Sequence, residues 1–179
     1  MNSLLTVTSI AFNPTLRFVV IVNPNSGPGS EPWWPNADYL RDVPKLNACS
    51  NVRTVGYVST AYCNRPIQEV YEDIRQYASW AKDKNSRSLG MNGIFFDETP
   101  NIFTENARNY LTAITQNVKN MGTLLGDGIN GAQICIMALA QAGKPSLRQW
   151  QGIEPLESSR TLTPNLEFTR LSRDHATYN

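Results

Sequence analysis

A repeated unit of apolar strand, turn and amphipathic helix fills the first two-thirds of the chain and most constrains its fold. Strands are predicted at three short, apolar runs rich in β-branched residues: 16–22, 53–58 and 93–98. Runs of this kind are typical of parallel strands that are buried on both faces. Three successive units predict an α/β fold in which right-handed crossovers return the chain to one parallel sheet.

A helix is predicted after each of these strands. The first is short, over residues 37–46, and Pro44 is expected to limit it because proline lacks the N–H group that a helix interior needs. The second is expected to begin at Pro66, and its apolar residues recur at helical spacing. The third is expected to have Thr104 as its N-cap.

The pattern divides the chain into three parts. Residues 1–14 are predicted to be an irregular N-terminus, and residues 15–122 to be the βα-repeat part of a TIM-barrel-like domain. Residues 123–179 form an atypical, irregular C-terminal segment, in which the apolar run 134–140 is interpreted as a helix. A (β/α)8 barrel typically needs about 250 residues. A chain of 179 residues with three clear units therefore predicts a partial barrel.

Charge and motif content exclude several classes of function. The chain has 16 basic and 15 acidic residues, whereas nucleic acids and anionic membranes require a concentrated basic surface. Its apolar runs are shorter than the about 18–20 residues that span a bilayer, and its first residues do not make a convincing signal peptide. One histidine and three separated cysteines give no metal-binding spacing. We predict no nucleic-acid partner, no membrane span, no metal and no cofactor.

The carboxyl ends of the predicted strands are the expected location of function, as in other parallel α/β sheets. The third strand ends in Asp97 and Glu98, and paired carboxylates are the usual equipment of glycoside hydrolysis. Because neighbouring residues on a strand point to opposite faces, we expect Asp97 to find its partner on another strand. A helix cap or a surface ion pair is the structural alternative for these carboxylates.

The end of the second strand supplies candidate hydrogen-bond donors to a substrate. They are Tyr57, Tyr62 and Arg65. Each of these residue types, taken alone, is more often structural. The sequence therefore leaves both interpretations open for these three residues.

Three motifs, in this order along the chain, resemble the spherulin-4 family (spherulation-specific family 4). They are VIVNPNSGPG at residues 20–29, TVGYV at 54–58 and GIFFDETP at 93–100. The resemblance extends over residues 15–122. The family is similar to glycoside hydrolase family 135, whose members are (β/α)8 barrels and are often secreted or cell-surface proteins of fungi. Characterised members cleave α-1,4-linked galactosamine or N-acetylgalactosamine polymers with retention of configuration.

The resemblance implies roles for individual residues. Asp97 corresponds to the candidate nucleophile, and Glu98 corresponds to the acidic neighbour beside it. The partner implied is an amino-sugar polysaccharide of a fungal exopolysaccharide or cell wall, and the location implied is extracellular or at the cell surface. The residues that the resemblance places along a sugar groove are Asn23, Asn25, Tyr57 and Tyr62.

The chain departs from the family pattern at both ends of the barrel. The family opens with a first barrel strand, which nothing before Thr15 supplies, and it carries a later strand ending in Phe-Glu, the expected acid/base, which is not found after residue 122. We therefore expect a truncated chain with little or no hydrolytic activity. Two hypotheses remain: an impaired retaining endo-acting galactosaminidase or N-acetylgalactosaminidase, and a non-catalytic carbohydrate-binding or cell-surface structural protein.

Overall fold

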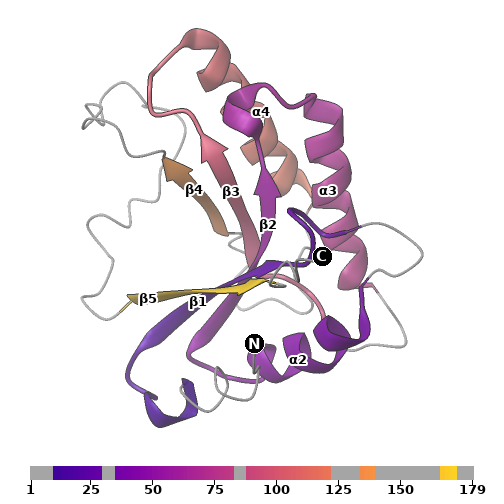
Figure 1. Ribbon diagram of the computed structural model, residues 1–179, viewed down its shortest axis with the longest axis vertical. Coiled ribbons are helices and arrows are strands. Elements are labelled where there is room, and N and C mark those ends of the chain that lie inside the picture. Colours follow the sequence, from indigo (N-terminus) through magenta and orange to yellow (C-terminus); the bar gives the residue numbers. More distant parts are fainter. Residues whose placement is uncertain (1–9, 30–34, 83–87, 122–133, 140–165, 173–179) are drawn as a thin grey trace, which may run out of the picture.

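A computed structural model gives the fold of this chain, and it describes residues 10–29, 35–82, 88–121, 134–139 and 166–172. These residues form a parallel sheet of five strands in the order β4-β3-β2-β1-β5, with helices beside it (Figure 1). The strands are β1 (Arg17–Asn23), β2 (Val52–Ser59), β3 (Gly93–Thr99), β4 (Ile134–Leu139) and β5 (Leu166–Ser172).

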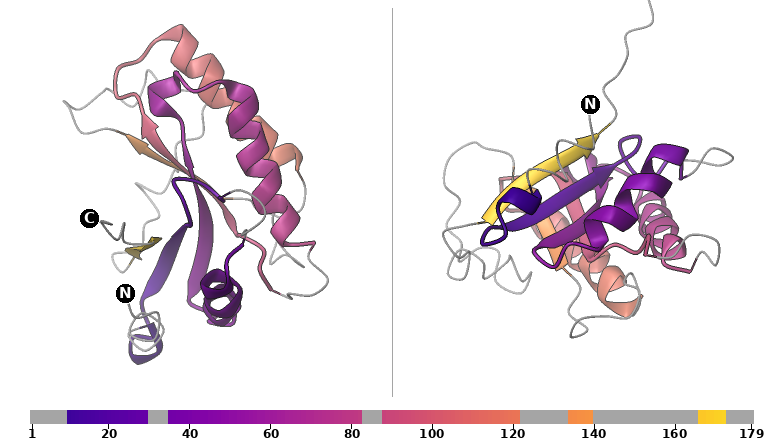
Figure 2. Two further views of the ribbon diagram at one scale, coloured as in Figure 1. Left: turned by 45° about the vertical axis from the view of Figure 1, so that its right-hand side comes forward. Right: turned by 90° about the horizontal axis from the view of Figure 1, so that it is seen from below.

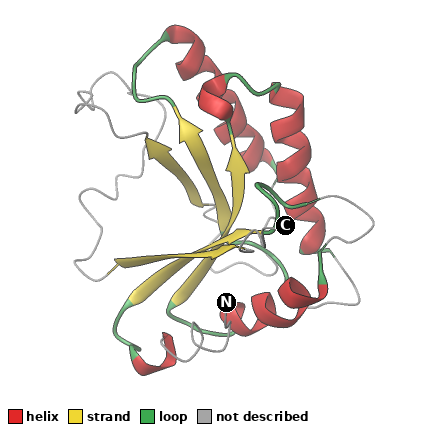
Figure 3. Ribbon diagram, viewed as in Figure 1, coloured by secondary structure: helices red, strands yellow, loops and turns green. Residues whose placement is uncertain are grey.

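Helices lie on one face of this sheet in the described part of the chain (Figures 2 and 3). They are α2 (Ala37–Asn47), α3 (Ile67–Trp80) and α4 (Glu105–Asn120), and a short 3-10 helix, η1 (Ala61–Cys63), follows β2. The α/β class and the parallel sheet are as predicted. The closing of these strands into a barrel stays a prediction.

Side chains of β1, β2 and β3 are buried on both faces of the sheet, as the apolar runs predict. Val22, Val58 and Phe96 point toward the helices and pack in one cluster with buried side chains of α2, α3 and α4. The opposite face carries a second cluster, which includes Val55 and Tyr57. This division follows from the two-residue period of a strand.

Gly56 allows α3 to approach β2 closely. A Cβ atom at this position would lie 2.7 Å from the Cδ2 and Cε2 atoms of Tyr77. The Tyr77 ring is fully buried, its hydroxyl donates a hydrogen bond to the Val22 carbonyl at 3.0 Å, and its centroid lies 5.2 Å from the ring centroid of Trp80. The helix therefore rests on the sheet at the one point of β2 where no side chain separates them.

Asparagine side chains fix the start of β3 against β2. The Asn47 amide donates to the carbonyls of Ser88 (2.6 Å) and Gly90 (2.9 Å), and its oxygen accepts the Thr54 hydroxyl at 2.7 Å. The Asn92 side-chain oxygen accepts the Thr54 N–H at 2.9 Å. These bonds support the β2–β3 register, which places the candidate site.

The helix predicted over residues 37–46 is confirmed as α2 (Ala37–Asn47), and Pro44 lies inside its last turn. The interpretation of residues 134–140 is wrong. Residues 134–139 form a strand where a helix was the interpretation, because a short apolar run has no period that separates the two structures. Leu166–Ser172 is a further strand within the segment that was predicted to be irregular.

Candidate functional site

The carboxyl ends of β2 and β3 bring the candidate residues together. Tyr57 is paired with Phe95 and Ser59 with Asp97, and directly paired residues of neighbouring strands point to the same side of a sheet. The Tyr57 and Phe95 ring centroids are 6.1 Å apart. Tyr57 is buried in the core cluster of this face and Phe95 is half-buried, whereas Ser59 and Asp97, two positions further along each strand, are partly exposed.

Glu98 does not follow the alternation of an extended strand. Its backbone has a φ of +54°, in the left-handed region that non-glycine residues rarely adopt. Its carboxylate oxygen Oε2 accepts a hydrogen bond of 2.5 Å from the Ser59 hydroxyl, and its N–H donates to Oδ1 of Asp97 at 2.8 Å. The expectation that Asp97 and Glu98 separate onto opposite faces is wrong, because alternation holds only while the backbone stays extended.

Thr60, the residue directly after β2, stabilises the left-handed backbone at Glu98. Its buried hydroxyl lies 2.8 Å from the Glu98 carbonyl oxygen and 3.1 Å from that of Asp97, and its N–H donates to the Asp97 carbonyl at 3.0 Å. Sequence reasoning missed both Ser59 and Thr60. The signal was their position, since they directly follow the predicted second strand (53–58), while Asp97 and Glu98 end the predicted third strand (93–98).

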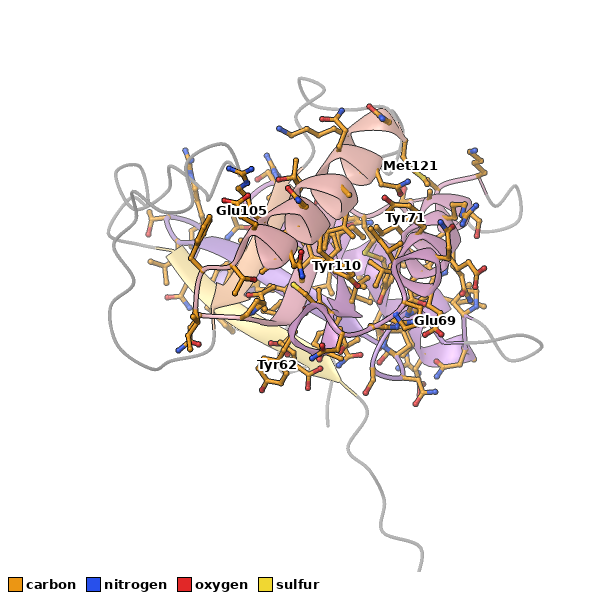
Figure 4. All side chains as sticks on the ribbon, turned by 90° about the horizontal axis from the view of Figure 1, so that it is seen from above. Tyr62, Glu69, Tyr71, Glu105, Tyr110 and Met121 are labelled. Carbon is orange, nitrogen blue, oxygen red and sulfur yellow. The ribbon has the colours of Figure 1, made fainter. Side chains whose placement is uncertain are left out.

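The turn after β2 is strained over three consecutive residues. Ala61, Tyr62 and Cys63 have φ values of +45°, +56° and +65°. Together with Glu98 they make four of the six non-glycine residues with positive φ in the part of the chain that the structure describes. Backbone strain of this kind clusters at binding and catalytic sites. The side chain of Tyr62 is 54% exposed and stands apart from Tyr110, which lies between α4 and α3 (Figure 4).

Arg65 is engaged within the protein. Its Nη1 atom donates to Oδ2 of Asp73 at 2.6 Å and to the Ser59 carbonyl at 3.1 Å, and its Nε atom donates to Glu69 at 3.3 Å. Burial raises the pKa of the Asp73 carboxyl, and the Arg65 guanidinium opposes this rise. Burial alone would lower the pKa of Arg65, but its bonds to the two carboxylates raise it. This side chain supports the turn, which agrees with the structural interpretation that the sequence left open, and its role as a substrate ligand stays a prediction.

Burial also changes the acidity of two groups near this turn. It raises the pKa of the Cys63 thiol to about 11 and that of the Tyr110 hydroxyl to about 12. The Tyr110 hydroxyl donates to the Arg65 carbonyl at 2.8 Å. Both groups therefore keep their protons at neutral pH.

The two asparagines after β1 differ in their surroundings. Asn23 is buried, its side-chain oxygen accepts the Gly27 N–H at 3.1 Å, and its carbonyl accepts the Tyr39 hydroxyl at 3.1 Å. These bonds close the turn that follows β1. Asn25 lies within that turn and is exposed.

Comparison with known proteins identifies the family. The family model described as "Spherulation-specific family 4" (Spherulin4) matches residues 4–139. The chain belongs to the spherulin-4 family. The resemblance drawn from the three motifs is thereby confirmed.

Two similar proteins show how much of the chain is matched. Spherulin-4 of Physarum polycephalum is 30% identical over 157 residues, which are 82% of this chain and 44% of that protein. The crystal structure of Aspergillus clavatus Sph3 in complex with GalNAc is similar with a TM-score of 0.65 and 39% identity, covering 75% of this chain and 50% of that one. The chain spans about half the length of these relatives.

The described residues contain no group of three or more His, Cys, Asp or Glu side chains that would hold a metal ion. Among the same residues, no helix is long and apolar enough to cross a bilayer.

Proposed function

We propose that the ends of β2 and β3 carry the nucleophile and part of the sugar-binding surface of a retaining glycoside hydrolase. The substrate proposed is an α-1,4-linked galactosamine or N-acetylgalactosamine polymer. The observation that carries this proposal is the pair Asp97 and Glu98, held at the end of a buried strand by Ser59 and Thr60. It is supported by the 39% identity to Sph3, whose crystal structure contains GalNAc.

Asp97 is the residue proposed to attack the sugar. In a retaining mechanism one carboxylate forms a bond to the anomeric carbon, while a carboxylic acid protonates the departing glycosidic oxygen. Oδ1 of Asp97 accepts the Glu98 N–H, which orients the carboxylate and leaves Oδ2 as the oxygen proposed to attack the anomeric carbon. Water then releases the sugar from Asp97 with the same configuration.

Glu98 is proposed to stabilise the transition state. Its carboxylate is oriented by the Ser59 hydroxyl, and a fixed negative charge beside an oxocarbenium-like transition state lowers its free energy. The proton donor expected on a later strand ending in Phe-Glu has no counterpart after residue 122. We therefore propose that this chain binds the polymer and hydrolyses it slowly.

A second function, binding without catalysis, is favoured by the aromatic residues. Phe95 is half-buried two positions before Asp97 on β3, and Tyr62 is exposed on the turn after β2, whereas Tyr57 is buried in the core. Aromatic rings present the apolar faces on which sugars stack. A protein that only holds the polymer needs this surface and not a proton donor.

One experiment distinguishes these functions. The purified chain is incubated with α-1,4-linked galactosamine and N-acetylgalactosamine oligosaccharides, and both binding heat and newly formed reducing ends are measured. The variants are Asp97→Asn and, as a matched control on the exposed surface of α2, Asp38→Asn.

The catalytic proposal predicts slow release of reducing ends that Asp97→Asn abolishes and Asp38→Asn leaves unchanged, with binding retained in both variants. Binding without release in the unmodified chain supports the second function. If neither type of oligosaccharide binds, both functions are refuted.

A further inference from the structure

The left-handed turn at Ala61–Cys63 needs support from its surroundings. Residues other than glycine avoid this conformation because Cβ approaches the backbone closely, and runs of such residues are rare. The turn contains no glycine. Its backbone bonds are the Asn64 N–H to the Ala61 carbonyl at 2.9 Å and the Arg65 N–H to the Thr60 carbonyl at 3.3 Å.

Arg65 ties this turn to three other elements. Through Nη1 it joins the last residue of β2, at the Ser59 carbonyl, to Asp73 on α3. Its own carbonyl accepts the Tyr110 hydroxyl from α4. The side chains of Arg65 and Asp73 are 22% and 16% exposed, so water competes little with these bonds. We call Arg65, Asp73 and Tyr110 the turn clamp.

The turn clamp contacts the proposed site through Ser59, whose carbonyl accepts a hydrogen bond from Arg65. Ser59 donates to Glu98, and the Ala61 N–H in turn lies 3.3 Å from the Ser59 hydroxyl oxygen. Tyr62 is at the centre of the strained turn and exposes more than half of its surface. The position of its ring relative to Glu98 is therefore set by the turn and not by packing in the core.

We infer that Arg65 and Asp73 are positioning residues that hold Tyr62 as an aromatic platform for a second sugar unit, next to the sugar bound at Asp97 and Glu98. This inference rests on the proposed function and adds a determinant of chain length to it. A monosaccharide at the carboxylates does not reach the platform. An oligosaccharide contacts both, so it binds more tightly while the clamp is intact.

The geometry distinguishes arginine from lysine at position 65. A guanidinium donates from Nη1 and Nε at once in a fixed plane, whereas an ammonium is a single point charge. Arg65→Lys keeps the charge and loses one direction of donation. We expect Arg65→Lys to keep only part of the support that the turn loses in Arg65→Gln.

The first test needs no sugar. Hydrogen exchange is measured on the full chain, on Arg65→Gln and Asp73→Asn, and on Arg108→Gln, a matched control whose exposed arginine pairs with Glu105 on α4. The amides of Asn64 and Arg65 should exchange about tenfold faster in the two clamp variants, and at the original rate in the control. Unchanged exchange in the clamp variants would overturn the inference.

The second test measures binding of a galactosamine tetrasaccharide and of GalNAc by calorimetry. Arg65→Gln and Tyr62→Ala should each weaken tetrasaccharide binding about tenfold, and the double variant no more than either single one. GalNAc binding should change less than about twofold. Tyr62→Ala alters an exposed side chain, so it remains informative if Arg65→Gln does not fold.

Two results of the second test separate the failures. Equal weakening for GalNAc and the tetrasaccharide, or additive losses in the double variant, would overturn the inference while the proposed function stands. An unmodified chain that binds neither sugar refutes the proposed function and, with it, the platform. The exchange experiment then reports on the clamp alone.

Discussion

Replacing Gly56 by alanine should destabilise the protein strongly, because the new methyl group would enter the ring of Tyr77. The Cβ atom would lie 2.7 Å from two ring carbons and 2.8 Å from Cγ, about 1 Å inside the optimal carbon–carbon separation. The ring has little room to move, since it is fully buried, hydrogen-bonded to the Val22 carbonyl and packed on Trp80.

The size of the destabilisation follows from the rigidity of both the β2 backbone and the Tyr77 ring. Overpacking a core typically costs 1–3 kcal/mol, and a clash between a strand backbone and an anchored ring belongs at the upper end, about 3 kcal/mol. With a urea m-value of about 2 kcal/mol per molar, the midpoint of unfolding should fall by about 1.5 M. Far-ultraviolet circular dichroism during urea titration measures this shift.

A double-mutant cycle with Tyr77→Leu tests the mechanism. The smaller side chain removes the ring that the methyl group meets, so Gly56→Ala should cost less than about 1 kcal/mol in that background, a coupling of about 2 kcal/mol. A loss below about 0.5 kcal/mol in the original background, or the same loss in both, would show that the α3–β2 contact is not fixed by Gly56.

Three further predictions concern single residues. Thr104→Ala should lower the free energy of unfolding by about 1 kcal/mol, with recovery in Thr104→Ser, because the Thr104 hydroxyl accepts the Ala107 N–H at the start of α4; denaturant titration measures both. Burial raises the pKa of the Tyr110 hydroxyl in the folded protein to about 12, above the ordinary value of about 10, so the stability it confers is complete below pH 10 and is lost as the pH rises through 12. Tyr110→Phe should abolish that part of the alkaline loss in unfolding curves recorded on either side of pH 10. Burial raises the pKa of Cys63 to about 11, so iodoacetamide at pH 8.5 should alkylate it more slowly in the folded than in the urea-unfolded chain, as mass spectrometry of its peptide would show.

The regular elements could be predicted because their signals are local. The three apolar runs became β1, β2 and β3, and Thr104 caps its helix as predicted. The bounds predicted for the helix at 37–46 differ by one residue from those of α2, which ends three residues after Pro44. The strand at 134–139 was misjudged because its pairing with β3 is a tertiary contact that a six-residue run does not encode.

The site was predictable in its location and not in its geometry. Strand order placed Asp97 and Tyr57 at one edge, but the positive φ of Glu98 depends on hydrogen bonds from Thr60, the residue that follows β2. Ser59 and Thr60 were missed because short hydroxyl residues are common in turns and carry no signal of their own. The sequence could not decide between a structural and a ligand role for Arg65, because its pairing with Asp73, eight residues further on, depends on how α3 lies against the turn.

The pairing of β5 with β1 has a consequence for the order in which the chain folds. Val20 of β1 pairs with Thr54 of β2 on one side and with Thr169 of β5 on the other. During synthesis, β1 and β2 leave the ribosome early, whereas residues 166–172 emerge much later, so one edge of β1 stays unpaired for most of translation. An unpaired, β-branched edge is a template for association with other chains. The nascent protein should therefore depend on chaperones most during that interval, and slowing translation before residue 166 should increase its aggregation.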